Sequence, residues 1–147
     1  EIRPVAPPPG FDAWYTQDFL TFAPGRRYDL IVSNPPYHLA EKIILHAWNL
    51  LAPRGVMIFL LRLAFLAGVG RRRGLWQTHP LAAVYVCSRR PSFYGGGTNG
   101  TDYAIFKWEK DAGGQPVKGN TFDYILHDRG PAQPITAPAA GNFTHFT

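Results

Sequence analysis

Residues 28–62 read YDLIVSNPPYHLAEKIILHAWNLLAPRGVMIFLLR, and this stretch decides the fold. The β-branched apolar core of residues 28–33 predicts a strand. Across residues 39–51 the apolar side chains recur at helical spacing, and the proline and glycine that follow end the helix. Residues 56–61 contain no polar side chain and predict a second, fully buried strand.

Two further strands are predicted at residues 81–88 and 102–108, with a glycine-rich segment, residues 95–100, between them. So short a connection predicts an antiparallel hairpin, because a parallel crossover needs about a dozen residues or more. We expect residues 68–80, which precede the hairpin, to form an exposed and mobile loop. Strand, helix, strand and hairpin are together typical of the closing half of an open α/β sheet.

The flanking residues carry weaker signals. Residues 19–20 predict a short buried strand end. Trp48 lies on the apolar stripe of the helix, so we expect it to be buried in the core. Trp76 has two interpretations: it anchors its loop to the domain, or it belongs to a surface that binds a nucleic-acid strand. Residues 111–147 are rich in Gly and Pro, so we expect them to be mostly extended or disordered, with an edge strand at residues 122–126.

The composition fits a single domain, since the chain has 147 residues of which 46% are hydrophobic and 17% charged. Its longest apolar run is far shorter than the roughly 20 residues that span a bilayer, which argues against a membrane protein. The single cysteine, Cys87, can form neither an intramolecular disulfide nor a zinc cluster. The lack of a disulfide framework favours a cytoplasmic location. The histidines show no metal-ligand spacing, so we expect no metal site.

Positive charge is concentrated in arginine clusters. The chain has 15 Lys and Arg against 10 Asp and Glu, a net charge of +5. Guanidinium groups pair bidentately with phosphate, so the clusters favour a polyanionic partner over a merely solvated basic loop. The candidate nucleic-acid-binding residues are Arg71, Arg72, Arg73, Arg89 and Arg90.

The sequence Asn34-Pro35-Pro36-Tyr37 stands directly after the first strand and before the helix. Open α/β sheets bind ligands at this place, beyond the carboxyl ends of the strands. The two prolines stiffen the backbone, and we expect their carbonyls to point outward without a helical partner. The Asn34 side-chain oxygen and the Pro35 carbonyl can then accept both hydrogens of a planar NH₂ group, and Tyr37 offers a face for a flat ring.

These residue types suit methyl transfer to a planar, weakly nucleophilic amine. The lone pair of such a nitrogen is delocalised, and two acceptors that hold its hydrogens out of the ring plane favour the tetrahedral transition state. No strong base is needed, because the amine becomes acidic once it is methylated. The alternative is that the sequence simply forms a turn that ends a strand.

Residues 28–62 resemble the motif IV region of class I S-adenosylmethionine (SAM)-dependent methyltransferases that modify amino groups, above all the phage and bacterial adenine-N6 DNA methyltransferases. Residues 88–110, SRRPSFYGGGTNGTDYAIFKWEK, are similar to the final hairpin of these enzymes. The resemblance implies the C-terminal part of a Rossmann-like fold, with a mostly parallel sheet that ends in an antiparallel hairpin. It assigns residues 1–110 to a partial catalytic domain and residues 111–147 to an irregular tail.

The resemblance also implies a SAM site. In residues 17–20, Asp18 matches the acid that accepts from the adenine amine of the cofactor, and Phe19 the residue that packs on the adenine ring. Glu1 matches the acid that binds the ribose, and Asn34 is expected beside the cofactor as well. The glycine-rich loop that holds the methionine part is not among the 147 residues. We therefore expect a fragment that alone shows no micromolar SAM binding.

The function implied by this resemblance is methyl transfer to the exocyclic amine of adenine in DNA. Methylation of RNA, or of a protein glutamine amide by the same Asn-Pro-Pro-Tyr chemistry, stays open. So does a non-catalytic remnant that only binds nucleic acid. Neither the recognition sequence nor the oligomeric state follows from the residues.

Overall fold

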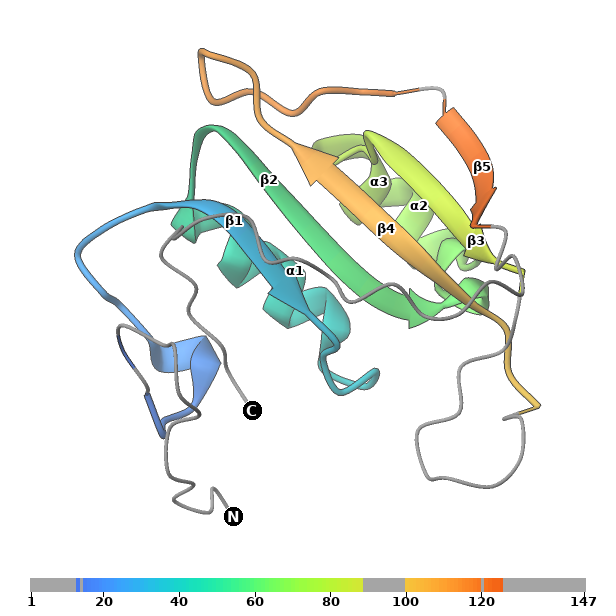
Figure 1. Ribbon diagram of the computed structural model, residues 1–147, viewed down its shortest axis with the longest axis horizontal. Coiled ribbons are helices and arrows are strands. Elements are labelled where there is room, and N and C mark those ends of the chain that lie inside the picture. The colour runs from blue at the N-terminus through green and yellow to red at the C-terminus, as the bar shows by residue number, and fades with distance from the viewer. Residues whose placement is uncertain (1–12, 14, 89–99, 120, 126–147) are drawn as a thin grey trace, which may run out of the picture.

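The computed structural model describes residue 13, residues 15–88 and 100–119, and the backbone of residues 121–125. The described chain forms one five-stranded sheet with the strand order β1-β2-β4-β3-β5 (Figure 1). Its strands are β1 (Tyr28–Ser33), β2 (Leu51–Arg62), β3 (Ala83–Cys87), β4 (Tyr103–Glu109) and β5 (Thr121–Ile125). The helices are η1 (Phe19–Thr21), α1 (Ala40–Leu50), η2 (Leu63–Leu66), α2 (Val69–Arg73) and α3 (Leu75–Thr78), where η denotes a 3₁₀ helix.

The sheet is mixed. β1 runs parallel to β2, β2 and β3 each run antiparallel to β4, and β3 runs parallel to β5. The predicted strands, the helix and the antiparallel hairpin are confirmed, as is the edge strand near residues 122–126. β2 begins earlier than predicted, because Leu51 already pairs with Tyr28 and the register shifts before Val56 pairs with Leu30. Residues 52–55 are the extra residues of β2 at this register shift, and Arg54 among them has a φ of 61°.

The three α-helices lie on one side of the sheet, behind it in Figure 1. On β2, Met57, Phe59 and Leu61 face this side and are fully buried, whereas Val56, Ile58 and Leu60 are only half-buried. The expectation that the strand is fully buried was therefore wrong for every second residue. The physical reason is that successive strand side chains point to opposite faces, and within the described ranges no helix covers the second face.

The core lies between the sheet and the helices. α1 contributes a buried stripe that includes Ile44, Ala47 and Trp48, as the helical spacing predicted. At the centre of the sheet, the Trp108 ring lies 5.8 Å from Phe59, between ring centroids, and neither side chain is exposed. None of the helices in the described ranges has the length and hydropathy that a membrane crossing needs.

The prediction of a loop over residues 68–80 was wrong, although most of these residues are exposed as expected. The segment contains α2 and α3, and Leu75 is buried. The Trp76 ring lies edge-on to Phe65 at 5.7 Å and stacks on Trp108 at 6.3 Å. Trp76 therefore anchors the segment to the core, and burial of this large ring outweighs the weak helix propensity of its glycines.

The prediction of a strand end at residues 19–20 was also wrong, because these residues lie in η1. The Asp18 carboxylate accepts a hydrogen bond from the Leu20 backbone nitrogen at 2.9 Å and caps this turn. Such a local bond from an aspartate offers the backbone an alternative to strand pairing. Beyond β4, the Asp111 side chain likewise organises a turn by accepting from the Gly113 and Gln115 nitrogens.

Lys110 caps the C-terminal end of α1. Its side chain is buried, and its Nζ donates to the carbonyls of Trp48 and Leu51 at 2.8 and 2.9 Å. A cation at this position satisfies carbonyls that the helix leaves unpaired. Burial lowers the pKa of Lys110, with the charge of Arg27 as a smaller cause. Burial also lowers the pKa of His79, and the charge of Lys110 lowers it further.

The lowered pKa of His79 predicts acid sensitivity. Between its folded pKa and the ordinary value of 6.5, the unfolded chain binds more protons than the folded chain, so stability falls as the pH drops through this window. We expect His79→Gln to reduce the loss of unfolding free energy between pH 7 and pH 5, measured by urea denaturation. An unchanged loss in this variant would contradict the prediction.

Candidate active site

The Asn34–Tyr37 turn leaves the carboxyl end of β1 and leads into α1. Asn34 and Pro36 are exposed, whereas Pro35 is buried and fixes the turn to the domain. The Leu39 nitrogen donates to the Pro36 carbonyl at 2.9 Å. The expectation that both proline carbonyls lack a helical partner was thus wrong for Pro36, because the turn before α1 uses its oxygen.

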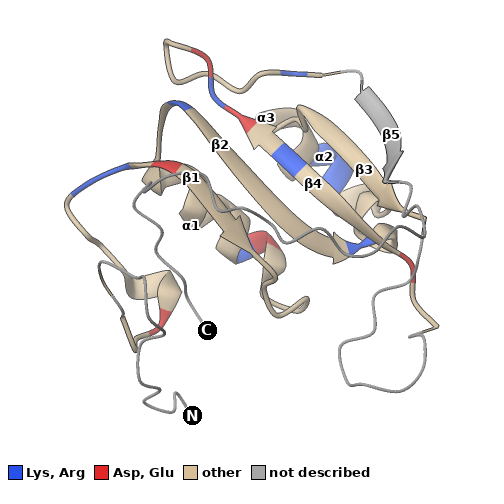
Figure 2. Ribbon diagram, in the orientation of Figure 1, with Lys and Arg blue, Asp and Glu red and all other residues tan. Residues whose placement is uncertain are grey.

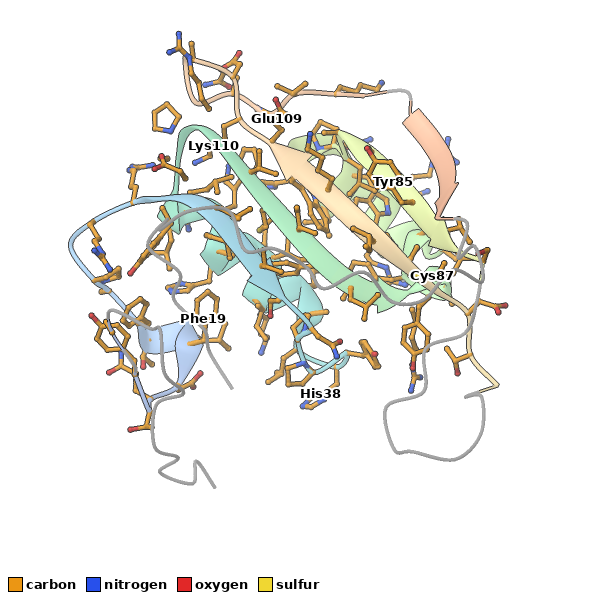
Figure 3. All side chains as sticks on the ribbon, in the orientation of Figure 1. Phe19, His38, Tyr85, Cys87, Glu109 and Lys110 are labelled. Carbon is orange, nitrogen blue, oxygen red and sulfur yellow. The ribbon has the colours of Figure 1, made fainter. Side chains whose placement is uncertain are left out.

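The other two acceptors of the turn remain available. In the part of the chain that the structure describes, neither the Asn34 amide nor the Pro35 carbonyl has a hydrogen-bond partner. One is a side-chain oxygen and the other a peptide oxygen of the next residue, so both belong to one short, proline-stiffened segment. The pair can accept two hydrogens from a single planar group. Figure 3 shows the neighbouring His38 at this end of the molecule, beyond β1.

Tyr37 is half-buried and lies against two side chains that the sequence did not single out. The guanidinium carbon of Arg62 is 4.7 Å from the centroid of the Tyr37 ring, and the Tyr103 ring centroid is 6.1 Å away at 46°. Arg62 ends β2 and pairs in register with Tyr103 at the start of β4. The expected parallel pairing of β1 and β2 could have indicated this contact. Parallel neighbours end at the same edge of the sheet, so Arg62 at the end of β2 comes close to the turn that follows β1.

Asp18 caps η1 and Phe19 is its first residue, and η1 contacts α1. The Phe19 ring meets His46 of α1 edge-on at 5.0 Å, and the His46 Nε2 hydrogen-bonds to the Phe22 carbonyl at 2.9 Å. One Asp18 oxygen caps η1, and its second oxygen has no partner among the described residues. An acceptor next to a half-buried aromatic ring fits the adenine part of SAM, the group that the sequence resemblance implies.

The arginine triplet lies in α2, which is coloured blue behind the sheet in Figure 2. The Arg71 Nε donates to the Phe65 carbonyl at 2.9 Å, and its guanidinium covers the Phe65 ring at 4.7 Å. Arg71 also donates to the Ala67 carbonyl. Arg72 and Arg73 are exposed, so they are the members of the triplet that can meet a partner.

The structure therefore brings the Asn34–Tyr37 turn together with Arg62 and Tyr103, and it places Asp18 with Phe19 against α1. Three further predicted site residues, Glu1, Arg89 and Arg90, lie outside the described residues.

One solved structure has a similar fold. A Listeria monocytogenes protein that is assigned to the class I SAM-dependent methyltransferases aligns with a TM-score of 0.53 and 13% sequence identity, over 72% of this chain and 39% of its own. The α/β fold is similar to that of the class I methyltransferases. The structure of M1.HpyAVI in complex with SAM aligns at a TM-score of 0.37 and 15% identity, over 68% of this chain and 58% of its own.

The chain spans 39% of the length of the Listeria protein. No protein-family model and no curated protein sequence matches the chain.

Proposed function

We propose that the protein containing these residues is a SAM-dependent methyltransferase that acts on the exocyclic amine of adenine in DNA. The observation that carries the proposal is a pair of acceptors at the carboxyl end of β1, the Asn34 amide and the Pro35 carbonyl, which have no hydrogen-bond partner among the described residues. The class I methyltransferase fold and the sequence resemblance of the turn to motif IV support it.

In this mechanism Asn34 and Pro35 orient the amine. The two oxygens accept its hydrogens and draw them out of the plane of the ring, so the nitrogen lone pair becomes available for attack. The same oxygens stabilise the positive charge that develops on nitrogen in the transition state, because the negative ends of their dipoles accept its hydrogens. Pro35 is buried and holds this geometry.

Tyr37 supplies a stacking surface for the base. A base in duplex DNA has to leave the stack before its amine can reach a reactive group, and aromatic side chains stabilise the extruded ring. Tyr37 is half-buried and contacts Arg62 and Tyr103, so its orientation is restrained before a substrate binds.

Asp18 and Phe19 would hold the adenine part of SAM, and Glu1 its ribose. Bound SAM supplies an electrophilic methyl group. The second Asp18 oxygen can accept a hydrogen bond from an amine. The ring of the adjacent Phe19 is held by its edge-on contact with His46.

The exposed arginines favour a polyanionic substrate over a protein glutamine. Each phosphate contact contributes about −0.9 to the slope of log affinity against log salt on duplex DNA. We expect the double variant Arg72→Met/Arg73→Met to reduce this slope by about 2, in fluorescence titrations with duplex DNA. Arg71→Met, the matched control from the same helix, should leave the slope unchanged because Arg71 binds internal carbonyls. Equal slopes in all three proteins would contradict a phosphate contact by α2.

The product of the full open reading frame provides the test of the function. We expect mass spectrometry to detect N6-methyladenine in DNA incubated with this product and SAM. Methylation of RNA or of a glutamine side chain instead would keep the chemistry and change the substrate. DNA binding without methyl transfer to any of the three would support the non-catalytic alternative.

A further inference from the structure

Arg62 contacts the Tyr37 ring, although it has no part in orienting the amine in the proposed mechanism. It is the last residue of β2, and its guanidinium carbon lies 4.7 Å from the centroid of the Tyr37 ring. A cation at this distance is attracted by the negative face of the ring. Arg62 therefore restrains the side chain to which we assign base stacking.

The backbone around Arg62 makes this restraint rigid. Arg62, the last residue of β2, pairs in register with Tyr103, the first residue of β4. Tyr103 is 3% exposed, and its ring contacts Tyr37 at this edge of the sheet. One residue further, the Leu63 nitrogen donates to the Asp102 carbonyl at 2.8 Å. Groups on sheet strands hold a geometry more accurately than groups on loops.

We propose that Arg62 is a positioning residue, which fixes the Tyr37 ring in the orientation that stacks on a planar substrate. The inference rests on the proposed function, because it assumes that Tyr37 contacts the substrate. Arg62 acts through the Tyr37 ring and does not neutralise a phosphate. Its loss therefore weakens substrate binding only as long as Tyr37 is present.

A double-mutant cycle on the product of the full open reading frame tests this coupling. The probe is a fluorescein-labelled oligodeoxyadenylate, and its Kd is measured by fluorescence anisotropy at several salt concentrations. We expect Arg62→Met to raise the Kd about three- to tenfold, and Tyr37→Ala to raise it about tenfold or more. In the Tyr37→Ala background, Arg62→Met should change the Kd less than about twofold. The salt slope of Arg62→Met should equal that of the wild type.

Two matched variants complete the design. Arg62→Lys keeps a cation above the ring and should recover most of the affinity. Arg54→Met removes the same charge from an exposed position near the opposite end of β2, and it should change the Kd less than about twofold. Arg62→Gln replaces the Met variant if that protein does not fold.

The outcomes separate this inference from the proposed function. Additive effects of the Arg62 and Tyr37 variants, or a salt slope that falls by about 0.7, would show a direct phosphate contact and overturn the positioning role. In that case DNA binding by the wild type would still support the proposed function. A wild-type protein that binds no oligodeoxyadenylate and methylates no adenine would overturn both.

Discussion

Asn34→Ala in the product of the full open reading frame should lower the rate of methyl transfer by about two to three orders of magnitude, the range seen when one polar group is removed from a transition-state site. The Asn34 amide is exposed and has no partner in the described part of the chain, so its removal breaks no internal hydrogen bond there. The effect should therefore appear in kcat, while the Kd for SAM and the free energy of unfolding stay close to those of the wild type. Single-turnover methylation measures the rate of the chemical step, titration calorimetry the Kd for SAM, and urea denaturation the free energy of unfolding.

Asn49→Ala is the matched control for this experiment. Asn49 is an exposed asparagine on α1, so the same atoms are removed from a surface outside the turn. We expect it to retain wild-type activity. Full activity in Asn34→Ala would dismiss the role of the amide, and an equal loss in both variants would point to a general effect on α1.

The second large effect should be on stability. Trp108 is fully buried, its Nε1 donates to the His79 carbonyl at 3.1 Å, and its ring meets Phe106 at 6.1 Å. We expect Trp108→Ala to lower the free energy of unfolding by about 3–5 kcal/mol, because it leaves a cavity at the centre of the sheet and an unpaired carbonyl. Urea denaturation measures the change.

Two variants show whether the loss comes from the cavity. Trp108→Phe keeps a ring but not the hydrogen bond, and it should fall between the wild type and Trp108→Ala. Val69→Ala removes apolar atoms from a side chain that is 65% exposed, and it should change stability by less than about 0.5 kcal/mol. A loss in Trp108→Ala as small as that of Val69→Ala would contradict the central position of Trp108.

Long-range pairing explains most of what the sequence missed. The strands, the helix and the hairpin follow from local periodicity, and the structure confirms them. Residues 68–80 contain three glycines and three arginines that indicate a loop, yet packing of Leu75 and Trp76 against the core orders them as helices. No local pattern contains the partners Phe65 and Trp108, which lie in other elements.

The candidate site divides in the same way. The proline-stiffened turn Asn34–Tyr37 is determined by adjacent residues, and its place between a strand and a helix could be predicted from the sequence because backbone restriction by proline is local. Arg62 and Tyr103 join it only in the folded sheet, where register and the parallel direction of β1 and β2 bring distant residues to one edge. The sequence alone thus determined the chemistry of the turn. Tertiary structure decided which side chains hold Tyr37 and that Arg71 binds internal carbonyls, since such contacts depend on strand order and packing rather than on neighbours in the chain.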